Sequence, residues 1–410
     1  MILFEFQYYK LFKINLFILR LYLYVGIISL CWDYIFMLGL YIHIPFCTHK
    51  CPFCDFAAFQ GLAKLEDKYI DVLIKEIDFK VKQNQVVNSI FFGGGTPSLT
   101  SIENLAKVFQ VLKTKFSFAP DIEISLESTP HSLDLAKTKE LINLGFNRLS
   151  IGVQTFNDSE LIAINRDHTS LQAEQGIEIA HLAGFKNINI DLMYGLPSQT
   201  YESFQTSFFK LMNLSKQYPY LTHFSLYGLT LEENSPFYKL HSKNSPLYPS
   251  DEISVNMYIF ANKIASQFGY DRYELSNFAK PNYQSTHNLN YWQLGEFYGF
   301  GISSYQYLNN YRQSNWKSIS KYLANYETCE TVEYIDPKTK LKELIMLGLR
   351  LKEGINLQEF SDKFNYNFAI NHAKTIAELE ENGYLLKDLN NIALTLKALP
   401  VSNLVIEQFF

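Results

Sequence analysis

The sequence predicts an α/β fold in which a partial barrel of six β/α units is followed by a smaller module of helices and one hairpin. From residue 39, short apolar runs typical of strands alternate with longer amphipathic stretches typical of helices. Polar residues or glycines stand at the carboxyl end of each apolar run, where a parallel barrel gathers its active site. From residue 336 this alternation stops. The chain has 410 residues, 47% of them hydrophobic, which is enough for two or three domains.

The six expected strands are short and apolar, as strands are when both faces of a parallel sheet are buried. They are 39–45 (GLYIHIP), 89–95, 123–128, 148–155, 187–195 and 223–229. Helical candidates lie between them, near 63–83, 101–115, 132–145, 170–184 and 200–216. Six loops that carry polar groups to one rim are what an enzyme-like cavity requires, so we expect a functional site there.

The first 36 residues are an apolar extension that we set apart from the fold. The stretch 14–32 is nearly long enough to span a bilayer, but Arg20 inside it is costly at the membrane centre. Two interpretations are open, a membrane anchor or a translation start at Met37. We favour the start at Met37, because this residue directly precedes the first expected strand.

The remaining chain divides into three expected parts. The barrel takes 37–235, a connector takes 236–335 and a winged-helix-like domain takes 336–410. Within the connector, 270–307 is dense in aromatic residues, Gly, Asn and His. We expect this segment to form irregular structure near a ligand rather than a regular element.

The last domain consists of helices, a two-stranded wing and a final helix. These elements are expected near 338–351, 356–364, 368–382, 384–396 and 401–408. Winged-helix modules often bind DNA. Residues 336–410, however, contain nine Lys and Arg and ten Asp and Glu, and the whole chain has a formal charge of −5. Because phosphate binding depends on clustered Lys and Arg, we expect no nucleic-acid partner.

Three of the five cysteines lie within eight residues of each other. Cys47, Cys51 and Cys54 are spaced C-x3-C-x2-C, whereas Cys31 and Cys329 are isolated. This is not the even, distributed set of a secreted disulfide framework. Clustered thiols indicate a reducing compartment and metal binding.

The residues alone leave two kinds of metal site open. A structural zinc ion normally has four protein ligands, and His43 or His49 could supply the fourth. A [4Fe–4S] cluster has four irons, so three cysteines leave one iron open to a substrate or cofactor.

The cysteine loop, with an aromatic residue before its last cysteine, resembles that of the radical S-adenosylmethionine (SAM) superfamily. The resemblance covers roughly 39–230 and includes the partial barrel. It implies that Cys47, Cys51 and Cys54 hold a [4Fe–4S] cluster whose open iron binds SAM. The chemistry of such a site belongs to the cofactor rather than to side chains.

Longer segments resemble the oxygen-independent coproporphyrinogen III dehydrogenases and their close relatives. These segments are GLYIHIPFC, FFGGGTPSL, RLSIGVQTF, DLMYGLPSQT, YELSNFAKP and HNLNYW, and the match covers most of 38–410. The family resemblance also implies a set of SAM contacts. They are Tyr41, Phe53, Gly94, Gly95, Thr96, Glu127, Gln154, Arg166 and Asp191.

One position departs from the dehydrogenases, which carry a further cysteine where this chain has Phe56. In this respect the chain resembles the sister group of haem chaperones. That resemblance implies that it binds haem and passes it to haem-requiring proteins, membrane-bound respiratory proteins among them. His287 of HNLNYW is then a candidate haem ligand, since histidine is a common axial ligand. Tyr291 and Trp292 either stack on the porphyrin or pack in the core, and we favour the core.

Three functions therefore remain to be compared. The first is a cytoplasmic haem chaperone, for which peripheral membrane association, through residues 1–36 or through a membrane-bound acceptor, and a homodimer are open possibilities. The second is a coproporphyrinogen III dehydrogenase. The third is a zinc-stabilised binding protein without a cluster.

Overall fold

The structure is a computed structural model that describes residues 37–231, 233, 235–240 and 245–410. The apolar extension 1–36, with its two interpretations, lies outside these residues. Within the described ranges, no helix combines the length and the hydropathy that a membrane crossing requires.

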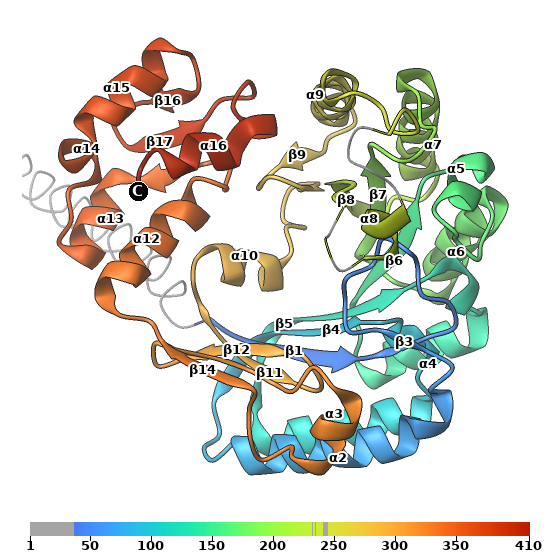
Figure 1. Ribbon diagram of the computed structural model, residues 1–410. Helices are drawn as coiled ribbons and strands as arrows, with labels where there is room; N and C mark the ends of the chain where they lie inside the picture. Colours follow the sequence, from blue (N-terminus) through green and yellow to red (C-terminus); the bar gives the residue numbers. More distant parts are fainter. Residues whose placement is uncertain (1–36, 232, 234, 241–244) are drawn as a thin grey trace, which may run out of the picture.

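The six predicted strands exist and lie side by side in one curved sheet (Figure 1). They are β1 (Leu38–Ile44), β4 (Val86–Gly94), β5 (Ser117–Ser128), β6 (Arg148–Gln154), β7 (Ile188–Tyr194) and β8 (Leu221–Gly228). All neighbours in this order are parallel. The sheet curves around a central space without closing, which confirms the partial barrel.

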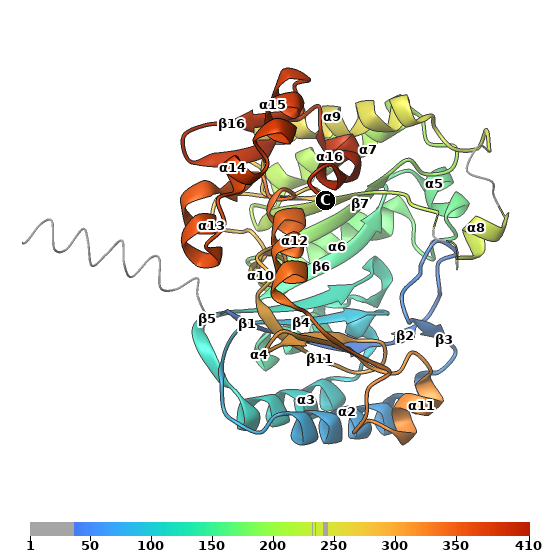
Figure 2. The same ribbon diagram turned by 60° about the vertical axis from the view of Figure 1, so that its left-hand side comes forward.

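The five predicted helices cover the outer face of the sheet (Figures 1 and 2). They are α2 (Glu66–Lys80), α3 (Ile102–Lys115), α4 (Leu135–Leu144), α6 (Ser170–Ala183) and α7 (Tyr201–Gln217). Thr169 and Thr200 begin α6 and α7 with capping boxes, in which each hydroxyl accepts from a backbone N–H of the first turn. The sequence reading missed α5 (Asp158–Ala163), α8 (Pro236–Leu240) and α9 (Asp251–Gln267).

The two faces of the strands differ, although we expected them to be apolar throughout. On β4, Phe92 stacks on Phe109 of α3 with ring centroids 5.6 Å apart, so it faces the helices. Its neighbour Phe91 stacks on Tyr41 of β1 inside the barrel. Because successive side chains of a strand point to opposite faces, Ile124 and Glu127 of β5 likewise divide between the core and the interior. Interior positions at the strand ends, such as Glu127, are polar because they line a cavity.

The expectation of irregular structure over 270–307 is wrong. The segment contains β9 (Asp271–Arg272), β10 (Asn277–Ala279), α10 (Thr286–Trp292), β11 (Glu296–Phe300) and most of β12 (Tyr305–Leu308). β11 pairs in parallel with β1, and β12, β13 (Tyr311–Ser314) and β14 (Thr331–Tyr334) continue the sheet outward. The aromatic residues that suggested a loop belong to these strands and to α10.

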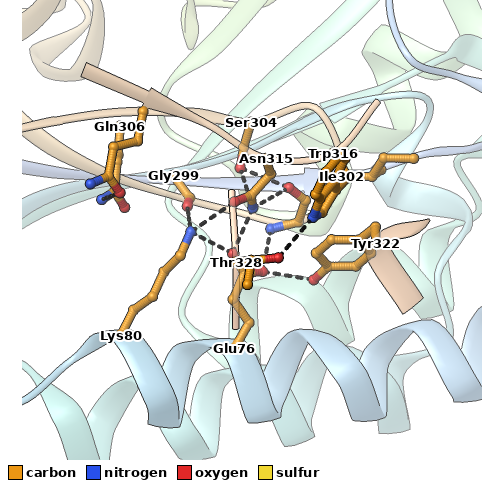
Figure 3. A network of polar contacts seen from close by, with 12 residues as sticks. Glu76, Lys80, Gly299, Ile302, Ser304, Gln306, Asn315, Trp316, Tyr322 and Thr328 are labelled. Atoms are coloured by element: carbon orange, nitrogen blue, oxygen red, sulfur yellow. Dashed lines mark hydrogen bonds and ion pairs between the residues drawn. The ribbon is translucent and has the colours of Figure 1, made fainter. Parts of the chain in front are cut away.

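A buried carboxylate attaches this added sheet to the barrel. Glu76 of α2 is fully buried and accepts from the Gly301 N–H at 2.8 Å, the Asn315 amide at 2.6 Å and the Tyr322 hydroxyl at 2.7 Å (Figure 3). Lys80, one turn further along α2, pairs with the same carboxylate at 2.6 Å. The network joins α2, the strand connections and α11 (Ile319–Ala324) through hydrogen bonds to one carboxylate.

The C-terminal module has the predicted order of helices and wing. It contains α12 (Pro337–Gly348), β15 (Ile355–Asn356), α13 (Leu357–Phe364), α14 (Phe368–Asn371), α15 (Ala373–Glu381), β16 (Leu385–Lys387), β17 (Asn391–Leu394) and α16 (Ser402–Glu407). The single helix expected over 368–382 is divided at His372. Figures 1 and 2 show the module beside β9 and α10, and the Lys352 N–H donates to the Tyr273 carbonyl at 2.9 Å.

Candidate functional site

The cysteine loop leaves the end of β1 and returns through a short parallel pair, β2 (Phe46–Cys47) with β3 (Phe59–Gln60). His43 of β1 ties the loop down, with Nδ1 3.1 Å from the Tyr41 hydroxyl and Nε2 3.0 Å from the Ala57 carbonyl. Burial lowers the pKa of His43 to about 4, so the ring is neutral. Both nitrogens are engaged, which disfavours His43 as the fourth ligand of a zinc ion.

A cavity of about 780 Å³ opens where the loop meets the carboxyl ends of β4, β5, β6 and β7. The three cysteines line it together with eight of the nine SAM contacts implied by the resemblance. These eight are Phe53, Gly94, Gly95, Thr96, Glu127, Gln154, Arg166 and Asp191. Tyr41 is the exception, because its ring faces a separate groove. His49 also lines the cavity, and its buried Nε2 has no hydrogen-bond partner among the described residues.

The thiols lie in a setting that fits a thiolate-bound metal cluster. Burial raises the pKa of Cys47 and of Cys54, so without a metal these thiols hold their protons more tightly than usual. The Thr96 hydroxyl lies 3.7 Å from the Cys47 sulfur, and Arg166 Nη1 lies 3.2 Å from the Cys51 sulfur. A donor set of three soft thiolates with a cation and open space beside it suits an iron–sulfur cluster.

Gly94 at the end of β4 and Gly95 directly after it are needed for packing against the cysteine loop. A Cβ on Gly95 would lie 2.6 Å from the Phe46 carbonyl oxygen, and Gly94 has a φ of +115° that favours glycine. The Gly95 N–H donates to the Ile44 carbonyl at 2.8 Å, and the Thr96 N–H to that of Phe46 at 2.8 Å. Glycines at a strand end can let the backbone approach a ligand closely. The contacts here show that they first let it approach the loop that carries the cysteines.

Two carboxylates face the cavity from neighbouring parts of the barrel. Glu127 accepts from the Gly94 N–H at 2.9 Å, and burial together with the nearby charge of Asp191 raises the pKa of Glu127 to about 7. Asp191 accepts from the Ser150 hydroxyl at 3.2 Å and the Asn189 amide at 2.8 Å, and burial raises its pKa as well. A cationic or hydroxyl-bearing ligand in the cavity would be attracted to this pair.

Gln154 reaches the cavity through a strained backbone. Its φ of 69° is in the left-handed region, and the pairing of β6 with β7 shifts register between Gly152 and Gln154. Such bulges occur next to functional sites, where they redirect a side chain. Arg166, whose Nη2 donates to the Gly152 carbonyl at 2.6 Å, lies beside the same bulge.

The sequence reading missed a polar cluster at the cavity wall. Thr48 Oγ1 lies 3.0 Å from His131 Nε2 and donates to Asp167 at 3.2 Å, and His131 Nδ1 lies 3.1 Å from Asp167. Burial alone would raise the pKa of Asp167, but the hydrogen bond and charge of His131 lower it to about 2. Thr48 directly follows Cys47, and Asp167 directly follows Arg166. Their positions beside predicted site residues could therefore have identified them from the sequence. Nothing local to His131 identified it.

His287 lies on α10 inside the barrel, away from the cysteine cavity. It is 1% exposed, with Nδ1 2.9 Å from the Ser89 hydroxyl and Nε2 2.8 Å from the Tyr291 hydroxyl. Its ring stacks on Phe91. Burial lowers the pKa of His287 to about 3. Iron ligation by His287 would require one of these hydrogen bonds to break.

The N-terminus of α10 is fixed by a buried carboxylate. Glu123 of β5 accepts from the Ser285 hydroxyl and the Thr286 N–H, both at 3.0 Å. At the other end of the helix, Trp292 lies under the guanidinium of Arg350. Trp292 is only partly buried, so it is neither a full core residue nor an exposed ring.

Comparisons with known proteins agree with this geometry. Residues 41–211 match the family described as the radical SAM superfamily, and residues 335–401 match the HemN C-terminal domain. The chain is 34% identical to heme chaperone HemW from Lactococcus lactis, over 90% of this chain and 96% of that protein. It is 32% identical to heme chaperone HemW from Bacillus subtilis, over 88% and 95%.

Among solved structures, coproporphyrinogen III oxidase (HemN) from Escherichia coli shares the fold, with a TM-score of 0.80 and 23% identity. The superposition covers 91% of this chain and 90% of that one. The barrel, the cysteine loop and the near full-length likeness together show that the chain belongs to the HemW family within the radical SAM superfamily.

Proposed function

We propose that this protein is a haem chaperone, which binds haem, a [4Fe–4S] cluster and SAM and delivers haem to acceptor proteins. The observation that carries the proposal is the extent of the likeness to HemW. An identity of 34% extends over 90% of this chain and 96% of the Lactococcus lactis protein, so the shared features include both the barrel and the C-terminal module.

The cavity supplies the groups that the cofactors need. Cys47, Cys51 and Cys54 would hold the cluster, which when bound and reduced can deliver an electron to SAM. Glu127 and Asp191 offer negative charge to the cationic and hydroxyl-bearing parts of SAM. Gln154 at the bulge of β6 and Arg166 beside it would hold the carboxylate and other polar groups of SAM.

The second candidate is oxidative decarboxylation of coproporphyrinogen III, favoured by the fold shared with HemN. Phe56 argues against it, because the family resemblance expects a further cysteine at this position of the dehydrogenases. The Phe56 ring is 67% exposed where the loop borders the cavity, so no thiol is available there. In the zinc alternative, His49 is the better candidate for the fourth ligand, because both ring nitrogens of His43 are already hydrogen-bonded.

The finer expectations are proposals as well. We propose the divisions 37–235, 236–335 and 336–410 for the barrel, connector and winged-helix-like domain. A membrane-bound respiratory acceptor and a homodimer stay predictions, as do a cytoplasmic location and peripheral membrane association. The balanced charge of the C-terminal module suits contact with a protein rather than with nucleic acid.

A direct test is haem binding followed by transfer. The anaerobically reconstituted protein is titrated with haem, freed of excess haem, and mixed with apomyoglobin as a generic acceptor. We expect a Soret absorbance that saturates at a fixed stoichiometry and then moves to the acceptor. A protein with an intact cluster that binds no haem would contradict the proposal.

A further inference from the structure

We propose that haem binds in a groove between the cysteine loop and β12, with Tyr305 as the ligand of its iron and Lys317 as the partner of its carboxylates. The assignment rests on the proposed function, because the occupant is the haem of a haem chaperone. The groove has an empty volume of about 1540 Å³ and is distinct from the cysteine cavity. Its aromatic lining residues are Tyr41, Phe56, Phe59, Tyr291, Phe297 and Tyr305.

The walls of the groove suit a flat apolar ring. Phe56 comes from the cysteine loop and is 67% exposed, and Tyr305 comes from β12 and is 46% exposed. Tyr291 of α10 and Phe297 of β11 pack edge to face behind them, with centroids 4.6 Å apart. Covering exposed aromatic rings with a planar apolar ligand is favourable because it removes apolar surface from water. Stacked or edge-to-face contacts between the rings stabilise the complex further.

Charge at the groove fits the carboxylates at one edge of a porphyrin. Lys317 lines the groove, is exposed, and forms no ion pair with any residue that the structure describes. Asp55 lines the groove from the cysteine loop, where it would repel the propionates. The two charges therefore select an orientation, with the carboxylate edge at Lys317 and the opposite edge toward Asp55.

The hydrogen bonds select the iron ligand. Histidine and tyrosine are both known haem ligands. In the groove, the hydroxyl of Tyr41 is bonded to His43, and that of Tyr291 is bonded to His287. Both ring nitrogens of these histidines are occupied. Within the described part of the chain, the Tyr305 phenol has no hydrogen-bond partner, so its oxygen can bind ferric iron while its proton passes to solvent.

The groove adjoins the cluster site at one wall and the added sheet at the other. Phe56 lines both the groove and the cysteine cavity, and its carbonyl accepts from Lys50 Nζ at 3.0 Å. On the other side, Asn315 donates to the Ser304 hydroxyl at 3.1 Å within the buried network of Glu76 (Figure 3). Ser304 precedes Tyr305, so this network holds the proposed ligand in place.

The test compares variants that touch only the groove with matched controls. Tyr305→Phe should remove the charge-transfer absorption of a ferric phenolate, and Lys317→Glu should weaken haem binding about tenfold or more. Tyr311→Phe on the adjacent strand is 45% exposed and lies outside the groove, so it controls for the first variant. Lys338→Glu on α12 is the matched charge control. Iron, sulfide and SAM binding should remain as in the parent protein in all four.

The outcomes distinguish a wrong assignment of the groove from a wrong assignment of the function. If the parent protein binds haem and neither groove variant changes the spectrum or the affinity, the groove assignment is wrong and the chaperone proposal stands. If the parent protein binds no haem, both proposals fall. A histidine-type spectrum in the parent that Tyr305→Phe leaves unaltered would likewise overturn the assignment of Tyr305.

Discussion

Replacing Glu127 with glutamine should flatten the pH dependence of stability of the SAM-free protein. The carboxyl faces the cavity, and its pKa rises from 4.5 to about 7 because of burial and then the charge of Asp191. The folded protein therefore binds this proton more tightly than the unfolded chain does. The contribution of Glu127 is most favourable below about pH 4.5, and it is lost as the pH rises through about 7.

The magnitude follows from the two proton affinities. At about 1.4 kcal/mol for each tenfold change, the displacement of the pKa from 4.5 to about 7 corresponds to a loss of at most about 3.5 kcal/mol. Glu127→Gln removes the ionisation and keeps a side-chain oxygen for the Gly94 N–H. Between pH 5 and pH 8, the variant should consequently lose less free energy of unfolding than the parent protein does.

Urea unfolding at pH 5 and pH 8 measures this difference in the parent, in Glu127→Gln and in Glu381→Gln. Glu381 is an exposed carboxyl at the end of α15 and should leave the pH dependence of the parent unchanged. Equal pH slopes for the parent and Glu127→Gln would show that Glu127 ionises as an ordinary carboxyl. The account of the cavity electrostatics would then be wrong.

Three further predictions concern the cluster, the sheet extension and α10. Cys51→Ser should abolish the cluster, measured as iron and acid-labile sulfide, whereas Cys329→Ser should retain it. A brown, sulfide-containing Cys51→Ser protein would contradict this. Glu76→Gln should lower the free energy of unfolding by about 3 kcal/mol, since it breaks a buried, hydrogen-bonded ion pair. The exposed Glu378→Gln should change it little. His287→Leu should lower the melting temperature while leaving the Soret maximum of bound haem in place, and a shifted maximum would show that His287 ligates the iron.

The sequence predicts the barrel well because its signals are local. Apolar runs with capped helices between them, such as those begun by Thr169 and Thr200, place strands and helices within a few residues. The segment 270–307 fails because strand pairing is not local. β11 is a strand because it lies beside β1, more than 250 residues earlier, and Glu76 holds the following turn in place. No periodicity within the segment reports that partner.

The same reasoning separates what could be predicted of the site from what could not. The three cysteines lie within eight residues of the sequence, and the carboxyl ends of parallel strands bring Glu127 and Asp191 to the same cavity. Hydrogen-bond partners, in contrast, come from distant segments. The occupied nitrogens of His287 and the contact of His131 with Asp167 depend on the tertiary structure, so a motif names such residues without stating whether they are free.

The most direct test of the central claim is anaerobic incubation of the reconstituted protein with SAM, a reductant and coproporphyrinogen III. The products are oxidised to porphyrins and separated, with cluster content and haem binding measured on the same sample. We expect no dicarboxylic product from a protein that has an intact cluster and binds haem. Formation of the dicarboxylic porphyrin with turnover would identify a dehydrogenase and would contradict both the argument from Phe56 and the assignment as a haem chaperone.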